Sequence, residues 1–418
     1  MQNKTLNLLL FVFLSASAFL NVIAFWSAKH ESLVGYADFS SFYAGAKMVR
    51  EGLGTSLYNF DSQKEFQQNL FPIAPSRPSP LPFIHPAYET LFFIPVTYLS
   101  YPKAYILWTL INVSILAILS FLFLNHFHGL QAHFRFVSIL CFFSFFPILI
   151  AVLQGQDSIL LLLFVTLAFI NLKANRDYRA GLFLALALFK FQIVLPLMLV
   201  FLAKRRWKAI FCFAAASVIL ILLSLQITGW RGLTEYPGLL FEQNQGAASE
   251  LGQLRRVTFP STMPNLRGLL YTIFANTIEE RFLIVGVILC SLIVALALIS
   301  IWKRYGEASE ETFNLKFSLS LMAGLLISYH LQIHDLSLLL LPILSVLNHL
   351  ATVPRYRVRP NWGFAMLLLL TVPDTLYLVT LSYSTFSVLA PVIIIFGLVI
   401  YAEVAFLEKR SPRLASTP

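Results

Sequence analysis

The sequence predicts an all-α polytopic membrane protein, a bundle of about 10–12 transmembrane helices that includes short re-entrant ones. Of its 418 residues, 58% are hydrophobic and only 12% are charged, and the mean hydropathy is +0.76. Soluble domains have about 45–50% apolar and about 25% charged residues. Since one crossing uses about 20 apolar residues, the crossings consume half or more of the chain, and an ordinary soluble protein is excluded.

The composition also excludes several kinds of site. Cys141, Cys212 and Cys290 each lie in an apolar run and share no short spacing, so they indicate neither a disulfide framework nor a zinc site. The net charge is +10, but the basic residues fall in short loops, where the positive-inside bias explains them. We therefore expect no nucleic-acid partner. We expect one integral membrane domain, 1–418, with long extracytoplasmic loops at 27–85 and 229–280.

The first apolar segment, Thr5 to Phe25, is long enough to cross the membrane. We favour an uncleaved helix, although the small residues Ser15 to Ala18 also resemble a signal-peptide cleavage region. The next segment, up to His85, has five basic and five acidic residues and no apolar span. Cytoplasmic loops are expected to be basic, so this neutral loop should lie outside.

Four basic clusters mark the expected cytoplasmic side, with both termini on that side. They are Lys173, Arg176 and Arg179; Lys204, Arg205, Arg206 and Lys208; Arg355, Arg357 and Arg359; and Lys409, Arg410 and Arg413. The predicted spans between them are 104–124, 136–153, 157–172, 208–228, 281–301, 316–330, 335–350, 362–381 and 387–407.

The segment Ala180 to Ala203 is long enough to cross once, yet it has basic residues at both ends. A hairpin of two half-helices, bent near Lys190, Gln192 and Pro196, returns the chain to the cytoplasm. The alternative is one full crossing, with Tyr88 to Leu99 also crossing to restore parity. A lysine inside an apolar segment costs about 2.5–3.5 kcal/mol on insertion scales. We therefore expect Lys190 to pair with a lipid phosphate or in a structural ion pair.

Asp38 begins a predicted amphipathic helix, because Phe42, Ala46, Val49 and Leu53 recur at helical spacing. The apolar stripe could lie on the membrane surface, with Asp38 held just above the hydrocarbon. An ordinary N-cap role for Asp38 is the alternative. The same choice applies to Asp157, which follows Gly155 and Gln156 before an apolar run and could cap that helix or bind a sugar hydroxyl.

Two further polar groups are expected to face outward. His330 and His334 have i, i+4 spacing and precede Asp335, but Leu331 stands where a zinc-protease motif needs Glu, so metal binding is weakly indicated. Hydrogen bonding to a sugar or phosphate, or a structural polar corner, is the preferred interpretation. Three arginines predicted to lie outside, Arg255, Arg256 and Arg267, contradict the positive-inside bias and could bind a phosphate. Asn244 and Asn265 lie in the same outer stretch.

Several short motifs occur in the order found in glycosyltransferase family 87, which the chain resembles over roughly residues 5 to 350. The first is the run from Asp38 to Ala46, which includes Tyr43 and continues to Gly52, Leu57 and Tyr58. The others are His85-Pro86; Trp108; Gly155-Gln156; Ala180-Gly181 leading to Lys190; and Arg205-Arg206-Trp207. The family belongs to the GT-C superfamily, whose members take a sugar from a polyprenyl-phosphate donor on the extracytoplasmic side. The resemblance implies a mannosyltransferase-like protein, located in a bacterial inner membrane, in which Asp38 is the catalytic base.

The predicted reaction is an inverting hexosyl transfer from a polyprenyl-phosphate sugar to a lipid or glycan acceptor among membrane lipids, with no cofactor and no obligatory metal. Asp38 acts as general base, and Lys190 with one or more of the outer arginines stabilises the leaving phosphate. The expected substrate-binding residues are Tyr43, His85, Gln156, Asp157, Lys190, Gln192, Asn244, Arg255, Arg256, Asn265, Arg267, His330, His334 and Asp335. The alternatives are a transporter or flippase of lipid-linked saccharides and a noncatalytic envelope-assembly subunit.

Overall fold

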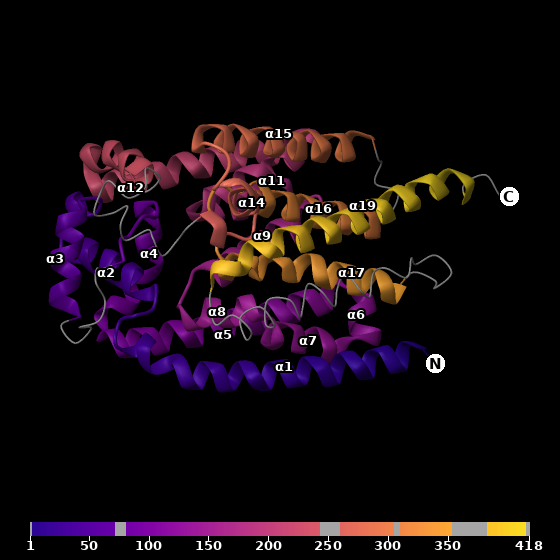
Figure 1. The fold of residues 1–418 in the computed structure, drawn as a ribbon, viewed down its shortest axis with the longest axis horizontal. Helices are drawn as coiled ribbons and strands as arrows, with labels where there is room; N and C mark the ends of the chain where they lie inside the picture. Colours follow the sequence, from indigo (N-terminus) through magenta and orange to yellow (C-terminus); the bar gives the residue numbers. More distant parts are fainter. Residues whose placement is uncertain (1, 72–80, 243–259, 305–309, 353–382, 415–418) are drawn as a thin grey trace.

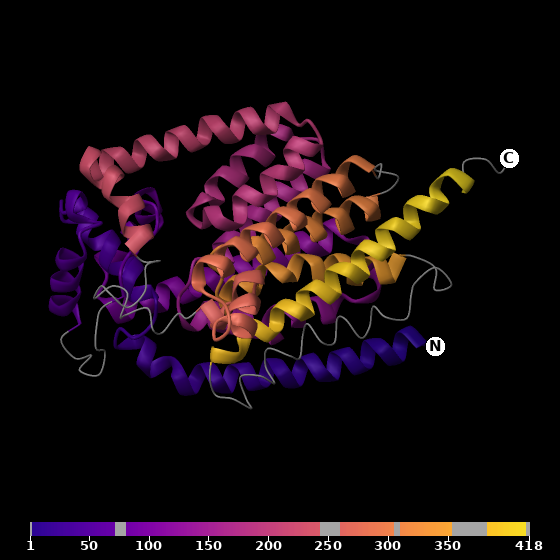
Figure 2. The same ribbon diagram turned by 45° about the horizontal axis from the view of Figure 1, so that its top comes forward.

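The computed structural model describes residues 2–71, 81–242, 260–304, 310–352 and 383–414, and all their regular secondary structure is helical (Figures 1 and 2). These residues contain seven apolar helical segments long enough to cross a membrane, or eight if a bent pair counts as one span. The all-α polytopic bundle predicted from composition is therefore confirmed. Predicted span 362–381 lies outside the described residues.

The long helices follow the predicted spans closely. They are α1 (Gln2–Leu33), α5 (Tyr101–His126), α9 (Ser158–Lys173), α12 (Trp207–Glu242), α15 (Glu280–Arg304), α16 (Glu310–Ile327), α17 (Leu340–Thr352) and α19 (Leu389–Leu414). Helix α12 is kinked at Gly229, where φ is +68°, so the predicted span 208–228 corresponds to its part before the kink. Span 136–153 is divided into α7 (Arg135–Ser144) and α8 (Phe146–Leu153), which are bent by 49°. Pro147 lies in the first turn of α8, where its missing N–H costs no helical hydrogen bond.

The segment between the two basic clusters is a hairpin. It comprises α10 (Asp177–Leu186), η4 (Ala187–Lys190) and α11 (Phe191–Ala203). Its apolar length would suffice for one crossing, but Arg206 Nη1 lies 3.3 Å from Asp177 Oδ1. A straight helix of that length would separate the two ends by about 40 Å. The chain therefore folds back near Lys190, as the charges at both ends predicted.

A second layer of short helices covers one end of the bundle (Figure 1). It contains α2 (Phe39–Arg50), η1 (Gly54–Ser56), α3 (Phe60–Leu70), η2 (Ala87–Glu89), α4 (Thr90–Phe93) and η3 (Ile94–Tyr98). The twelve residues of η2, α4 and η3 are three short helices rather than a crossing. The extent of α2 agrees with the prediction, but its expected position on the membrane surface is wrong.

Helix α2 is buried on almost all sides instead of lying on a membrane. Phe39 and Phe42 are nearly inaccessible and belong to an aromatic cluster with Phe93, Tyr101 and Trp108. The Phe39 and Trp108 rings are stacked with centroids 6.2 Å apart. The spacing of the apolar residues in the sequence indicated one apolar face of this helix. Small residues on the other face, such as Ala44, allow neighbouring elements to pack there too.

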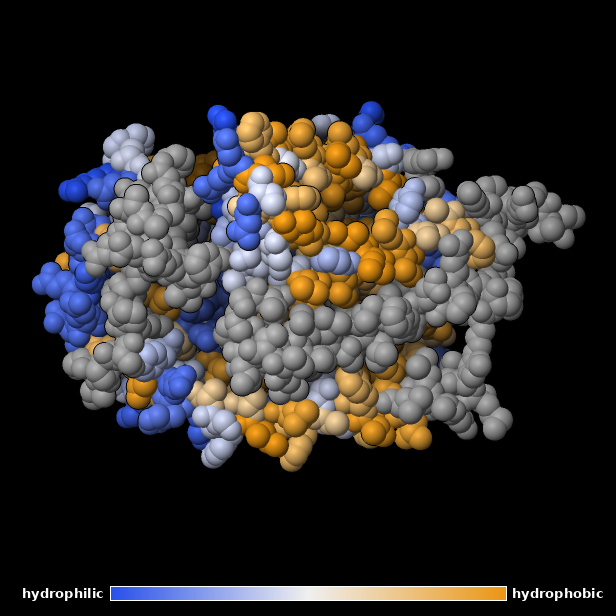
Figure 3. All heavy atoms as spheres, in the orientation of Figure 1, coloured by the Kyte–Doolittle hydropathy of each residue, from blue (hydrophilic) through white to orange (hydrophobic). Residues whose placement is uncertain are grey.

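The described ends of α1 and α19 lie at the opposite end of the bundle from this layer (Figures 1 and 2). That placement agrees with the prediction that both termini lie on one side of the membrane. Hydrophilic residues gather over α3, and hydrophobic residues over α1 and α15 (Figure 3). Exposed apolar side chains such as Ile293 and Leu296 on α15 fit a lipid-facing surface.

A substitution at Gly181 tests the close packing of the first half of the hairpin, α10, against α12. A Cβ at Gly181 would lie 2.2 Å from the carbonyl oxygen of Ala209 on α12. We expect Gly181→Ala to push α10 from α12 and to lower the free energy of unfolding by about 1–3 kcal/mol. Thermal unfolding of the purified protein in detergent measures this. Gly286→Ala on α15 is the matched control, since the nearest atom is 4.0 Å away, and it should leave the melting temperature unchanged or raise it. Equal melting of both variants would contradict the close contact.

Candidate active site

Asp38 lies at the start of α2, and its carboxylate is held from another element. Its Oδ2 accepts a hydrogen bond from Gln156 Nε2 at 2.6 Å, and its backbone N–H donates to Gln154 Oε1 at 3.1 Å. The side chain makes no capping hydrogen bond to α2, so the N-cap alternative is wrong. Asp38 remains half-buried, and its carboxylate can therefore meet a substrate.

The loop between α8 and α9 explains how Asp38 is positioned. Gly155 has φ +61°, and a Cβ there would lie 2.6 Å from the Cβ of Phe39. Only glycine combines this left-handed backbone with so close an approach. The Gly155 carbonyl accepts a hydrogen bond from Trp108 Nε1 at 2.9 Å. The loop and the first turn of α2 are thus in direct contact, and they carry Gln156 to Asp38.

Asp157, Lys190 and Asp335 form a buried ion cluster next to this loop. Lys190 Nζ lies 3.2 Å from Asp157 Oδ1 and 3.1 Å from Asp335 Oδ1. All three side chains are at most 7% exposed. Asp157 makes no capping hydrogen bond to α9. The Lys190 ammonium therefore joins the hairpin tip to the starts of α9 and η7 (Ile333–Leu339), which supports the ion-pair interpretation.

His85 and Glu89 extend the cluster from the layer of short helices. His85 Nδ1 lies 2.8 Å from Glu89 Oε2 and 3.6 Å from Asp157 Oδ2. Glu89 has no exposed surface, and burial raises the pKa of its carboxyl to about 8. Burial opposes charge on His85, but the two carboxylates outweigh it and raise the pKa of that imidazole. Protons therefore compensate part of the negative charge here.

Glu89 was not singled out from the sequence. It lies in an apolar stretch, where an ionisable residue is costly and usually functional, and it stands four residues after His85. These two facts were available signals. The three side chains of His85, Glu89 and Asp157 place one ligand atom each within 4.8 Å of one another, a set of possible metal ligands that the sequence did not predict.

The two histidines of the 330–335 segment lie in different environments. His334 is buried, with Nε2 3.6 Å from Asp335 Oδ1, whereas His330 is half-buried and its carbonyl accepts a hydrogen bond from Ser328 Oγ. The predicted helical i, i+4 relation is wrong, because α16 ends at Ile327 and η7 begins only at Ile333. Gln332 and Asp335 form a capping box that starts η7.

Several predicted site residues make structural contacts. Tyr43 Oη donates to the Leu99 carbonyl at 2.8 Å. Asn265 caps α14 (Leu266–Phe274) and donates to the Ser328 carbonyl at 2.7 Å. Arg267 lies 4.0 Å over the Tyr329 ring. Gln192 is half-buried on α11. Asn244, Arg255 and Arg256 lie outside the described residues.

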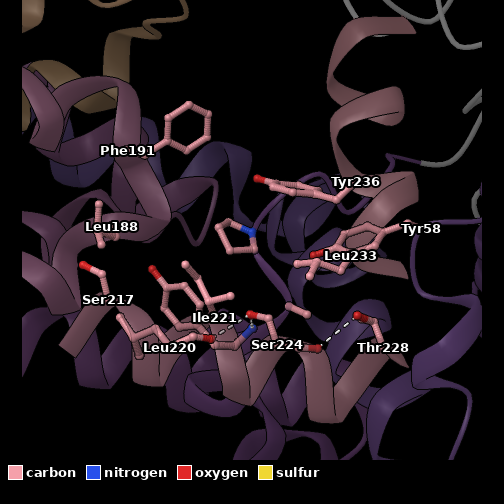
Figure 4. Close-up of a pocket in the computed structure, with 13 residues that line it drawn as sticks. Tyr58, Leu188, Phe191, Ser217, Leu220, Ile221, Ser224, Thr228, Leu233 and Tyr236 are labelled. Atoms are coloured by element: carbon pink, nitrogen blue, oxygen red, sulfur yellow. Dashed lines mark hydrogen bonds between the residues drawn. The ribbon is translucent and has the colours of Figure 1, made fainter. Parts of the chain in front are cut away.

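A cavity of about 210 Å³ is lined in part by residues that neighbour members of the ion cluster in the sequence (Figure 4). Pro86, Ala87 and Tyr88 form part of one wall, between His85 and Glu89. Leu188 and Phe191 of the hairpin tip, which flank Lys190, line it as well. The remaining lining residues are Tyr58, Ser217, Leu220, Ile221, Ser224, Thr228, Leu233 and Tyr236. The same two segments thus hold both the ion cluster and a largely apolar cavity.

The sequence profile of glycosyltransferase family 87 matches residues 83–328, more than half of the chain. The chain belongs to glycosyltransferase family 87. Its matched region includes the ion cluster apart from His334 and Asp335, and it includes the cavity apart from Tyr58. This family 87 protein is therefore a membrane glycosyltransferase of the GT-C-like kind. Neither curated proteins nor solved structures give a match.

Removing the lysine of the ion cluster should destabilise this family 87 protein. Lys190→Ala leaves Asp157 and Asp335 buried without their shared cation, and loss of one partner of a buried ion pair costs about 3–5 kcal/mol. Thermal unfolding in detergent should show a large drop. Adding Asp335→Asn to that variant should restore part of the stability, because it removes one uncompensated charge. Lys103→Ala, at an exposed site, is the control. Unchanged melting of Lys190→Ala would contradict the structural role of the cluster.

Proposed function

We propose that this protein transfers a hexose, such as mannose, from a polyprenyl-phosphate donor to a hydroxyl of a lipid or glycan acceptor on the extracytoplasmic side of a bacterial inner membrane. The observation that carries the proposal is the Asp38 carboxylate, which is half-buried, accepts a hydrogen bond from Gln156 and does not cap its helix. A carboxylate with free lone pairs at the edge of a buried polar cluster is suited to general-base work.

The proposed step is a single displacement with inversion. The acceptor oxygen attacks the anomeric carbon, the bond from that carbon to the phosphate oxygen breaks, and the phosphate leaves with the bonding electron pair. Asp38 takes the acceptor proton. The leaving phosphate needs no proton if a cation stabilises its charge. Lys190 has three N–H groups and two carboxylate neighbours, which leaves one N–H for a phosphate oxygen.

The cavity supports a donor with a lipid chain. It is lined mainly by apolar and aromatic groups, and part of its wall comes from the segments that carry His85, Glu89 and Lys190, with most of the rest from α12. A prenyl chain in this cavity would bring its phosphate toward the ion cluster. Ile221, which lines the cavity, is 52% exposed and lies on the bundle surface. A chain could therefore enter from the lipid phase between α12 and the hairpin.

The base assignment predicts the effect of Asp38→Asn. We expect a folded protein whose transfer rate falls by about 10²–10⁴-fold, because the amide cannot accept the proton. Purified protein in detergent with a radiolabelled polyprenyl-phosphate sugar measures this rate. Asp61→Asn is the matched control, since Asp61 lies nearby in sequence at the exposed start of α3, and it should keep wild-type transfer. Full activity of Asp38→Asn would remove the base assignment.

The lipid-chain site predicts a second result. Ser217→Phe should fill part of the cavity and raise KM for a long-chain polyprenyl donor by about tenfold, since each CH₂ kept from burial costs about 0.8 kcal/mol. A short, water-soluble prenyl donor should be affected little. Ser217→Ala is the control and should leave both KM values unchanged. Equal effects of Ser217→Phe on long and short donors would contradict this position for the chain.

Transfer in detergent also separates the enzyme from the alternatives. A flippase needs a sealed vesicle to show its activity, and a noncatalytic subunit needs its partner. A panel of polyprenyl-phosphate sugars in the same assay identifies the sugar. Product formation by the purified protein alone is the expected result. Absence of product from every donor and acceptor, with lipid-linked saccharide moved across sealed vesicles, would favour the flippase.

A further inference from the structure

Three side chains beside Lys190 have the composition and spacing of a metal site. The ligand atoms of His85, Glu89 and Asp157 lie within 4.8 Å of one another, and two of the separations are 2.8 and 3.6 Å. Metal–ligand bonds of about 2.0–2.2 Å place two neighbouring ligands of one ion about 3 Å apart and opposite ligands about 4.2 Å apart. Small side-chain movements would therefore bring all three atoms onto a single ion.

The charges of the cluster are unbalanced when its possible metal ligands are deprotonated. Glu89, Asp157 and Asp335 are buried carboxylates, and Lys190 is the buried ammonium that contacts two of them. Once Glu89 and His85 have released the protons that they share in the metal-free protein, three negative charges face one positive charge, with Asp38 at the half-buried edge. Burying unpaired charge costs several kcal/mol per ion. One divalent cation balances the cluster, because two added positive charges bring its sum to zero.

Buried carboxylate oxygens without a hydrogen-bond donor also favour a bound cation. Glu89 Oε1 is completely buried, and within the described part of the chain it has neither a hydrogen bond nor an ion-pair partner. Asp157 Oδ1 lies 3.2 Å from the Lys190 ammonium, whereas the nearest ionic partner of Asp157 Oδ2 is His85 Nδ1 at 3.6 Å. Buried polar atoms in native proteins are almost always satisfied. In the deprotonated cluster, Glu89 Oε1 and Asp157 Oδ2 therefore have acceptor positions open to a cation.

We propose that His85 Nδ1, Glu89 and Asp157 bind one divalent cation, with Mn²⁺ as the best-matched ion. One imidazole nitrogen with two carboxylates suits Mn²⁺ and Zn²⁺ better than Ca²⁺, and Mn²⁺ leaves more positions for water or a phosphate oxygen. His85 coordinates as the neutral tautomer with hydrogen on Nε2. Binding is independent of the proposed function, but the ion's role rests on it: the ion would add the positive charge at the leaving phosphate that Lys190, shared by two carboxylates, supplies only in part.

The experiment is a Mn²⁺ titration of the chelator-treated, full-length protein in detergent at pH 8, where ligands are readily deprotonated. The loss of the electron paramagnetic resonance signal of free Mn²⁺ reports binding. We expect one tightly bound Mn²⁺ per chain. Glu89→Gln should weaken the Kd by at least about tenfold, since loss of even an outer-shell partner has that effect. His85→Phe should do the same, and its ring fits a pocket formed by Phe42 and Phe83.

The matched control is Glu403→Gln. Glu403 forms another buried histidine–carboxylate pair, with His349 Nε2 3.2 Å from Glu403 Oε1, and no third ligand among the described residues is grouped with it. This variant should bind Mn²⁺ like the wild type. Thermal unfolding of each variant shows that it is folded, and two different ligand substitutions keep the test valid if one of them unfolds.

The outcomes separate the site from the proposed function. No stoichiometric Mn²⁺ binding, or equal binding by wild type, Glu89→Gln and His85→Phe, would overturn the site. Binding lost in both ligand variants and kept in Glu403→Gln supports it, even if no donor sugar is transferred. Full transfer by metal-free protein that still binds Mn²⁺ in the titration would keep the site and the proposed function but overturn the ion's role at the phosphate.

Discussion

The ion cluster around Lys190 is the constraint on which the rest of the site depends. Its ammonium contacts Asp157 and Asp335, which come from the starts of two different helical elements. Because a charge buried in an apolar bundle cannot leave its partner without a large penalty, these contacts fix the hairpin tip against α9 and η7. Asp157 in turn meets His85, so the layer of short helices is joined to the same point.

A second constraint keeps Asp38 available. The backbone N–H groups at the start of α2 have hydrogen-bond partners on other backbone groups. Ser41 N donates to the Asp38 carbonyl, and Phe39 N donates to the Gln154 carbonyl. The donors that a capping side chain would serve therefore have other partners. This arrangement leaves the carboxylate to Gln156 and to a substrate. The adjoining cavity uses the same segments as the ion cluster, so the proposed lipid chain and phosphate would meet where the charges are.

Much of this site was predictable as a set of residues, but not as a set of contacts. Lys190 was singled out because a lysine in an apolar segment is costly, Gln156 and Asp157 because they precede an apolar run, and His334 and Asp335 because of their spacing from His330. Their partners were not predictable, since Asp38 and Gln156 are 118 positions apart and Ser158 and Asp335 are 177 apart. The contact of Glu89 with His85 and that of Arg267 with the Tyr329 ring were not predictable either, because a sequence does not show whether a charge meets an ionic partner or an aromatic ring.

By itself, the sequence determined the membrane class and most of the helical spans and favoured the hairpin over a full crossing, because hydropathy and the distribution of basic residues act locally along the chain. It also determined family membership, through motifs that keep their order. Only the tertiary structure decided that α2 is buried rather than membrane-bound, that Asp38 and Asp157 do not cap their helices, and that His85 and Glu89 face Asp157. Those outcomes depend on which elements pack together, and packing joins segments that no local pattern relates.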